Sequence, residues 1–197
     1  MPLIQTIYTT NTHTNDSTPT IAGTTDAPGN TINVYAEDGI TLLAITTSDA
    51  NGDWSVGNAD YTSSLADGEH NLKITASDPG GESAAATFLI NVDTTPPIII
   101  GDTTVEVQED STVVYPYIAD KSPGIIWSLG GDDAMLFNID VNGNLSFNSA
   151  PNYENPNSTS GDNNYQVTVI ATDDFGNVSS SSVTVIVTDS VEVVIFT

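Results

Sequence analysis

Short runs of alternating apolar and polar residues recur about every eight to twelve residues, with turn-forming residues between them. A period of two indicates strands that bury one face, and no segment shows the period of an amphipathic helix. The pattern predicts an all-β chain of tandem antiparallel Greek-key β-sandwiches. We expect strands near residues 20–22, 31–36, 41–47, 54–56, 71–77, 84–92, 104–108, 112–118, 125–129, 136–139, 145–148, 165–172 and 179–188.

The two halves of the chain end alike. Residues 71–78 resemble residues 164–173, and the shared Ala-x-Asp ends at 76–78 and 171–173 lie 95 positions apart. A period of this size fits one sandwich domain. Asp93 is followed by two threonines and two prolines, which favour a stiff, extended joint. We therefore expect domains at 1–97 and 98–197, with residues 1–18 forming either a leading strand or a linker.

Charge excludes several functions. The chain has 26 acidic residues, two lysines (Lys73 and Lys121) and no arginine. Phosphates could not be neutralised, so nucleic acid and anionic membranes are excluded as direct partners. The longest apolar run is too short to insert in a membrane, and without cysteine there is no disulfide or thiolate metal site. We expect a monomeric fragment of a larger protein, because residues 1–3 begin no signal peptide. An apolar tail, 191–197, follows a finished domain and is either the start of a further domain or a strand that adds to a neighbour's sheet.

The acids lie in loops. Asp and Glu are absent from 71–77, 84–92, 165–172 and 179–188, and they gather in short clusters between strands. A salt-adapted acidic surface is the alternative, but it would place acids on strand faces too. Calcium, which takes carboxylate and carbonyl oxygens, explains the distribution better.

Strand order predicts which acids meet. Counting from the strand at 20–22, the exit end of the first domain carries Asp26, Asp49, Asp53, Asp67, Glu69 and Asp93. The entry end of the second domain carries Asp120, Asp173 and Asp174. So many carboxylates cannot converge without a cation. We expect several Ca²⁺ ions at the joint, with Asp67, Glu69, Asp93, Asp120 and Asp173 among the ligands. Glu37, Asp38 and Asp78 are expected at the opposite end of the first domain.

The exit end of the second domain is expected to be acidic as well. It would carry Glu109, Asp110, Asp132, Asp133, Glu154, Asp162 and Asp189 beside a long polar loop, residues 149–163. Loops of this length without secondary structure are often functional. Asp132, Asp133, Asn152, Tyr153 and Asp162 are therefore candidates for holding a ligand there.

Two Asn-Gly pairs, at 51–52 and 142–143, predict β-hairpins. Asp49, Asn51 and Asp53 also imitate the start of an EF-hand loop, but Trp54 stands where that loop needs glycine. Trp54 and Trp127 are expected in the cores. No catalytic residue is predicted, since His13 lies in a polar leader and His70 opens a strand.

Three isoleucines break the polar face of the second domain's predicted sheet. Ile126, Ile170 and Ile186 are out of phase with the buried positions of their strands and could form an exposed contact strip. Chance is the alternative, since scattered surface apolar residues are common.

Residues 137–145 (FNIDVNGNL), 152–154 (NYE) and 171–173 (ATD) resemble cadherin repeats. That resemblance implies calcium roles for Glu109, Asp120, Glu154, Asp173 and Asp189. Residues 21–24, 51–55, 65–68 and 93–97 resemble bacterial Ig-like repeats. Residues 151–156 and 161–165 are similar to repeats of very large RTX adhesins of Gram-negative bacteria, which implies type I secretion to the bacterial cell surface.

Two functions fit these features. One is a calcium-rigidified adhesin segment whose second domain binds a peptide or protein ligand on a host or other surface, with neighbouring repeats as further partners. The other is a passive spacer that only holds other domains apart. A hydrolase is disfavoured, because no aromatic-lined cleft accompanies the acids.

Overall fold

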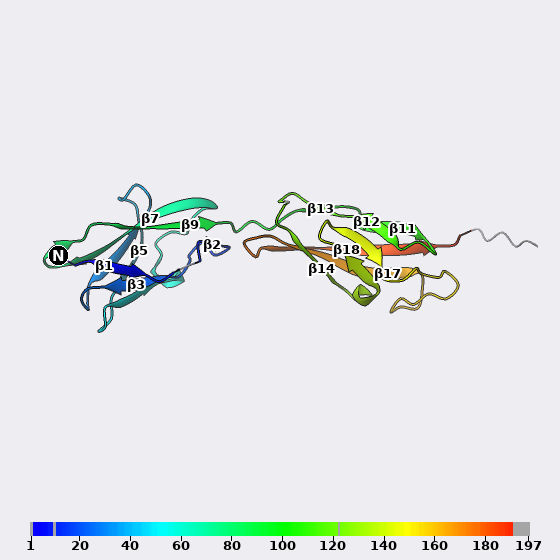
Figure 1. Cartoon of the computed structure of the whole chain (residues 1–197), viewed down its shortest axis with the longest axis horizontal. Helices are drawn as coiled ribbons and strands as arrows, with labels where there is room; N and C mark the ends of the chain where they lie inside the picture. The colour runs from blue at the N-terminus through cyan, green and yellow to red at the C-terminus, as the bar shows by residue number, and fades with distance from the viewer. Residues whose placement is uncertain (1, 10, 122, 191–197) are drawn as a thin grey trace, which may run out of the picture. The chain divides into compact units, whose positions relative to one another are not determined.

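The computed structural model describes residues 2–9, 11–121 and 123–190. The chain divides into two compact units, Met1–Thr95 and Pro96–Thr197, so the division falls two residues before the expected boundary. Each unit is a β-sandwich, and the described residues contain no α-helix (Figure 1). The tail at 191–197 lies outside the described residues, as does the prediction made for it. Among the described residues, no helix has the length and apolar character needed to cross a membrane.

Unit 1 contains two sheets. One has the order β1-β3-β6, and the other has the order β2-β9-β7-β4-β5, with β8 paired to β7. Burial alternates along most of these strands, as the sequence pattern predicted. The strands are β1 (Ile4–Ile7), β2 (His13–Thr14), β3 (Ile21–Thr25), β4 (Thr31–Tyr35), β5 (Leu42–Thr47), β6 (Asp53–Val56), β7 (Gly68–Asp78), β8 (Gly81–Glu82) and β9 (Ala86–Val92).

The leading residues of unit 1 form strands. β1 pairs antiparallel with β3, with Ile4 opposite Thr25, and β2 pairs parallel with β9. The segment is therefore the first strand of the sandwich, divided between its two sheets. This changes the strand count, so the loops at 26–30, 36–41 and 48–53 lie at the opposite end of the unit from the one predicted by counting from residue 20.

The predicted hairpin at Asn51-Gly52 is wrong. β5 lies beside β4 in one sheet, whereas β6 lies beside β3 in the other, so the turn carries the chain across the sandwich. Gly52 has φ +85°, and a Cβ there would lie 2.6 Å from the Thr25 carbonyl oxygen. The turn residues were recognised correctly, but turn chemistry does not determine which strand becomes the partner.

Unit 2 has a sheet in the order β11-β18-β17-β14, a second in the order β12-β16-β15, and the pair β10-β13. Its elements are β10 (Ile99–Ile100), β11 (Thr104–Gln108), β12 (Val113–Pro116), β13 (Ile118–Ala119), β14 (Ile126–Gly130), η2 (Ala134–Leu136), β15 (Phe137–Ile139), β16 (Asn144–Phe147), β17 (Asn164–Thr172) and β18 (Val178–Thr188). A short 3₁₀ turn in unit 1, η1, spans Asn58–Asp60.

The hairpin predicted at Asn142-Gly143 is confirmed. β15 and β16 pair antiparallel, with Ile139 opposite Leu145. Gly143 has φ +84°, and a Cβ there would lie 2.2 Å from the Tyr117 carbonyl oxygen. Asp140 Oδ1 accepts hydrogen bonds from the Asn142 and Asn144 backbone N–H groups, which holds the turn.

Each unit has its own apolar core. The first is built on Ile32, Ile74, Leu72, Trp54 and Phe88, among others. The second contains Phe137, Phe147 and Tyr165, whose rings pack with the Phe137 and Phe147 centroids 4.3 Å apart. Trp54 is buried as predicted, and Trp127 is half-buried against the second core.

The registers fix the two ends of unit 2. β11 runs parallel to β18, with Gln108 beside Thr188, so the residues that follow both strands share the exit end. β17 is antiparallel to β18 and therefore ends, at Thr172, on the entry side. Every acid that was assigned to an end of the second domain lies at that end.

Candidate metal centre

Three carboxylates converge at the exit end of unit 2. Glu109 follows β11, Asp189 follows β18, and Glu154 comes from the loop of residues 149–163. One carboxylate oxygen from each lies within 4.8 Å of the others. Glu109 is buried, with 7 % of its surface exposed, whereas Glu154 and Asp189 are exposed. Three segments far apart in the sequence therefore present carboxylates to one point.

Glu109 is held in place by the backbone. Its Oε2 accepts a hydrogen bond from the Tyr153 N–H at 2.9 Å, and its Oε1 accepts one from the Ser190 N–H at 2.9 Å. The Ser190 hydroxyl donates to the same Oε1. The Ser190 N–H above all, followed by that of Tyr153, lowers the pKa of Glu109 below its usual value. The carboxylate is thus kept ionised and fixed in orientation.

The donor set suits Ca²⁺. It consists only of hard carboxylate oxygens, which calcium prefers, and it contains no imidazole or thiolate. The two lysines of the sequence are elsewhere: Lys73 is in β7 of unit 1, and Lys121 follows β13, toward the entry end of unit 2. Among the described residues of unit 2, no basic side chain is therefore placed to neutralise Glu109, Glu154 and Asp189. The residues present fit a divalent cation.

The loop of residues 149–163 is folded against the unit. Asp133 is buried, its Oδ1 accepts the Thr159 N–H at 2.6 Å, and its Oδ2 accepts the Gln166 N–H at 2.7 Å. Asp133 therefore anchors this loop to β17. Both of its oxygens accept backbone donors inside the fold, and whether Asp133 also holds a ligand stays a prediction.

The other predicted ligand candidates do lie at this end. Asp132 and Asn152 are exposed, and Tyr153 is 38 % exposed beside Glu154. Asn152 Oδ1 accepts the Asn155 N–H at 2.7 Å. Asp162 Oδ1 accepts the Ser160 hydroxyl and the Asn164 N–H, each at 2.8 Å. Whether any of them holds a ligand stays a prediction.

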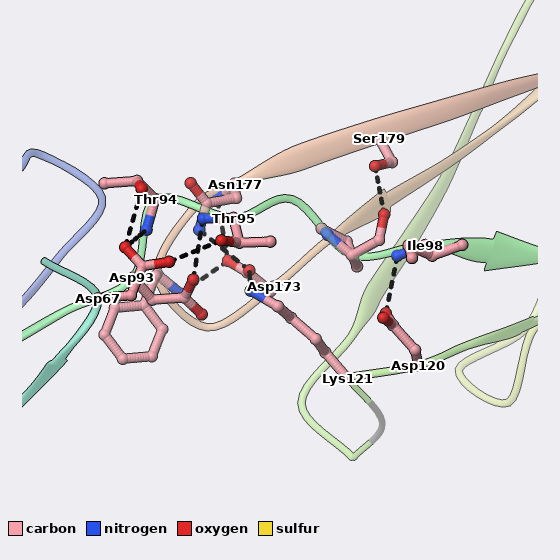
Figure 2. Close-up of polar contacts among 12 residues, drawn as sticks. Asp67, Asp93, Thr94, Thr95, Ile98, Asp120, Lys121, Asp173, Asn177 and Ser179 are labelled. Atoms are coloured by element: carbon pink, nitrogen blue, oxygen red, sulfur yellow. Dashed lines mark hydrogen bonds and ion pairs between the residues drawn. The ribbon is translucent and has the colours of Figure 1, made fainter.

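The entry end of unit 2 is arranged differently (Figure 2). Asp173 is buried, and its Oδ2 lies 3.1 Å from the Lys121 Nζ. Asp120 Oδ1 accepts the Ile98 N–H at 2.7 Å. Burial raises the pKa of Asp173, but hydrogen bonds from Asn177, Lys121 and Phe175 outweigh it, so the pKa lies below its usual value. The predicted metal ligand Asp173 has a protein cation as a partner.

Unit 1 places Asp67 and Asp93 together at its exit end (Figure 2). Asp67 Oδ1 accepts the Thr94 N–H at 2.8 Å, and its Oδ2 accepts the Thr95 hydroxyl at 2.6 Å. Asp93 Oδ1 accepts the Thr95 N–H at 3.0 Å. Glu69 is exposed on β7, opposite Asn91 of β9. Calcium binding by these three residues stays a prediction.

Five predicted positions in unit 1 are wrong. Asp26 and Asp53 lie at the entry end, where Asp26 Oδ1 accepts the Leu3 N–H at 3.0 Å. Asp49 is there as well, because its N–H donates to the Asp53 carbonyl. Glu37 and Asp38 follow β4 toward the exit end, since Tyr35 pairs with Lys73 and Thr31 with Ser77. Asp78 was placed correctly. The reversal has one cause: the leading residues are the first strand.

The predicted contact strip does not form as one strip. Ile126 lies opposite Thr172, diagonal to Ile170, and it is 67 % exposed. Ile186, however, pairs with Asn164, which is six residues from Ile170 along β17. At about 3.3 Å per residue that is roughly 20 Å. The alternation of apolar and polar residues correctly predicted that the three isoleucines share one face of the sheet. It could not predict how far apart they lie along the strands.

Sequence reasoning missed two features of these sites. The backbone of Ser190 binds Glu109 although no motif marks it. The partner of Asp173, Lys121, was noted only as one of two lysines. The sequence did contain a clue to this pair: Lys121 directly follows Asp120, in a loop that was expected at the same end of the unit as Asp173.

Known proteins are similar to this chain in sequence or in fold. Residues 6–94 match the family model described as a bacterial Ig-like domain. Among solved structures, a titin fragment, I67–I69, is similar with a TM-score of 0.54 in one variant, at 14 % identity, covering 95 % of this chain and 66 % of that one. Drosophila N-cadherin EC1-3 gives a TM-score of 0.43 at 16 % identity, covering 96 % and 68 %. Human protocadherin-24 EC1-2 gives 0.45 at 17 %, covering 96 % and 100 %. A search of curated proteins gives no match.

Proposed function

We propose that the chain is an extracellular segment of a large RTX-type bacterial surface adhesin, rigidified by Ca²⁺. The observation that carries the proposal is the convergence of the Glu109, Glu154 and Asp189 carboxylates within 4.8 Å, where the described part of unit 2 places no basic side chain to neutralise them. A cation at this point would remove their mutual repulsion. The bacterial Ig-like match over residues 6–94 supports the bacterial surface setting.

The cation would tie three segments together. Glu109 is already fastened to the backbone of residues 153 and 190, so the loop after β11, the long loop and the chain leaving β18 are near one another before metal binds. Binding a cation to a prearranged set costs little further ordering. The bound ion would stiffen the chain where it leaves unit 2, which is the mechanical property that a long adhesin needs.

Unit 2 could also hold a ligand at this end. Calcium takes six to eight oxygen ligands, and three carboxylates leave coordination positions to fill. A peptide carboxylate could occupy one, with Tyr153 providing an aromatic surface beside Glu154. The ligand would then be a peptide or protein presented on a cell or other surface, and its capture would require calcium.

A passive spacer is the second candidate, and the structure offers it specific support. Asp133, Asn152 and Asp162 each accept hydrogen bonds from within the fold, so the long loop is folded down and its polar groups are partly used. Nothing in the described residues indicates catalysis, and two groups that could serve as an acid or a base have other partners. His70 Nε2 lies 2.8 Å from the Ala66 carbonyl oxygen, and Asp173 is paired with Lys121.

A peptide-library binding screen separates the two candidates. The wild-type chain is screened with calcium and with a chelator, and E154Q is screened with calcium. Binding that requires calcium and is lost in E154Q supports ligand capture at the exit end. The absence of binding under all conditions supports the spacer. Binding that survives the chelator contradicts a calcium-dependent site.

A further inference from the structure

The entry end of unit 2 contains a carboxylate that already has a cation. Asp173 is 6 % exposed, and the Lys121 Nζ lies 3.1 Å from its Oδ2. The other contacts of Asp173 are donors too. Its Oδ1 accepts the Phe175 and Asn177 N–H groups at 3.0 and 2.9 Å, and its Oδ2 accepts the Asn177 side-chain amide at 3.1 Å. Both oxygens therefore accept two hydrogen bonds each, which is the usual capacity of a carboxylate.

The loop that carries Lys121 packs against the turn that contains Asp173, which places the Lys121 ammonium group beside the Asp173 carboxylate. Gly124, in the same loop, has φ +109°, and a Cβ on it would lie 2.5 Å from Asp174 Oδ2. The loop thus runs close against the turn that contains Asp173. The Lys121 side chain is 24 % exposed, so the ion pair is mostly shielded from water. Partly buried charge pairs are screened less by salt than exposed pairs.

The carboxylates at the entry end suit a metal ion less well than the three carboxylates at the exit end do. A metal bound to Asp173 would have to replace the Lys121 ammonium or lie next to it, and two neighbouring cations repel each other. Asp120 is also committed in part, because its Oδ1 accepts the Ile98 N–H. Within the described residues of unit 2, Lys121 is the only lysine and lies at the entry end, so no lysine of this unit faces Glu109, Glu154 and Asp189.

We propose that Lys121 serves as a built-in cation for Asp173, so that the Asp173 carboxylate is stabilised without metal and unit 2 binds Ca²⁺ only through its exit end. The two lysines of a chain with 26 acidic residues would then not be interchangeable. Lys121 would determine where calcium can bind, and the folded state of the 173–177 turn would not depend on the calcium concentration.

A double-mutant cycle tests the proposal. K121M, D173N and K121M/D173N are melted beside the wild type, each in excess calcium and in chelator. D173N keeps an oxygen that can accept the Phe175 and Asn177 N–H groups, so it is expected to fold. K73M, which removes the other lysine, is the matched control. We expect each single variant to lower the melting temperature by a few degrees, with a coupling between the two sites that is the same in calcium and in chelator.

Calcium counting by isothermal titration calorimetry completes the test. We expect D173N to bind as many calcium ions as the wild type. A D173N chain that binds one ion fewer overturns the proposal, as does a coupling that is present in chelator and vanishes in calcium, because the metal would then displace the lysine. The cycle in chelator does not require any calcium site to exist. The cycle in chelator therefore still tests the Lys121–Asp173 pair if the exit end binds no calcium. Loss of calcium binding in E109Q tests the exit end separately.

Discussion

Glu109 Oε1 accepts the Ser190 backbone N–H at 2.9 Å, which joins two residues 81 positions apart at the end of unit 2. Through this bond the chain leaving β18 is fastened to the loop after β11. The same carboxylate, together with Glu154 and Asp189, forms the candidate metal centre. One side chain therefore contributes both to the fold and to the proposed calcium site, and the two contributions can be separated by experiment.

Calcium stabilisation should depend on Glu109. E109Q keeps an oxygen that can accept one backbone N–H but removes the charge, so we expect it to lose most of the rise in melting temperature that calcium produces. The measurement is calorimetry of both chains with calcium and with chelator. D132N is the control, since Asp132 is an exposed acid at the same end. Equal loss in D132N would point to diffuse acidity and not to a site.

Asp133 should matter for stability with or without calcium. In D133A the Thr159 and Gln166 N–H groups lose a part-buried acceptor, and a donor left without a partner away from water costs about 1–3 kcal/mol. We expect a loss of roughly 2–4 kcal/mol in the free energy of unfolding, measured with denaturant, and faster proteolytic cleavage within residues 149–163. D132A, which changes the exposed neighbour, should be near neutral. If D133A is also neutral, Asp133 does not anchor the loop.

The hydrogen bonds of Asp38 predict that unit 1 becomes less stable in acid. The Thr41 hydroxyl donates to its carboxylate at 2.6 Å, and with the Thr41 and Ile40 N–H groups it lowers the pKa of Asp38 from its ordinary value of 3.8 to about 2. Because the folded pKa is the lower one, the stabilisation is present above about pH 3.8 and is lost as the pH falls toward 2. Unfolding curves of wild type and D38N should therefore differ most above pH 4 and converge near pH 2. A constant difference down to pH 2 would contradict the assignment.

Two glycines with similar backbone angles should differ in cost. Gly143 (φ +84°) and Gly161 (φ +73°) both lie in the left-handed region, but only a Cβ on Gly143 meets an atom, the Tyr117 carbonyl oxygen at 2.2 Å. G161A should cost about 1 kcal/mol from backbone strain alone. G143A must also displace the hairpin and should cost at least about 2 kcal/mol more. Equal costs would show that the turn can move away from Tyr117.

The sequence predicted most of the fold for identifiable reasons. Alternation placed the strands, and Asn142-Gly143 placed a hairpin. In unit 1 one ambiguity, whether residues 1–18 are a strand, reversed the ends assigned to Asp26, Asp49, Asp53, Glu37 and Asp38. Nothing local distinguishes a first strand whose partners, β3 and β9, follow later in the chain.

The candidate site was predicted in part. Strand order alone gave the end of unit 2 at which Glu109, Glu154 and Asp189 lie, because the strands of that unit were counted correctly. It could not show that Asp133 is buried, that Lys121 reaches Asp173, or that Ile186 lies far along the sheet from Ile170. These depend on side-chain direction and register, which a pattern of residue types does not contain.

The melting temperature of the wild-type chain in calcium and in chelator tests the central claim most directly. A ligand that binds only the folded state at 100 times its dissociation constant stabilises that state by about 2.7 kcal/mol. For a unit of this size that corresponds to a rise of about 10 °C. We predict a rise of this order in the transition of unit 2, saturating with calcium and reduced in E109Q. An identical transition in calcium and chelator would contradict the account.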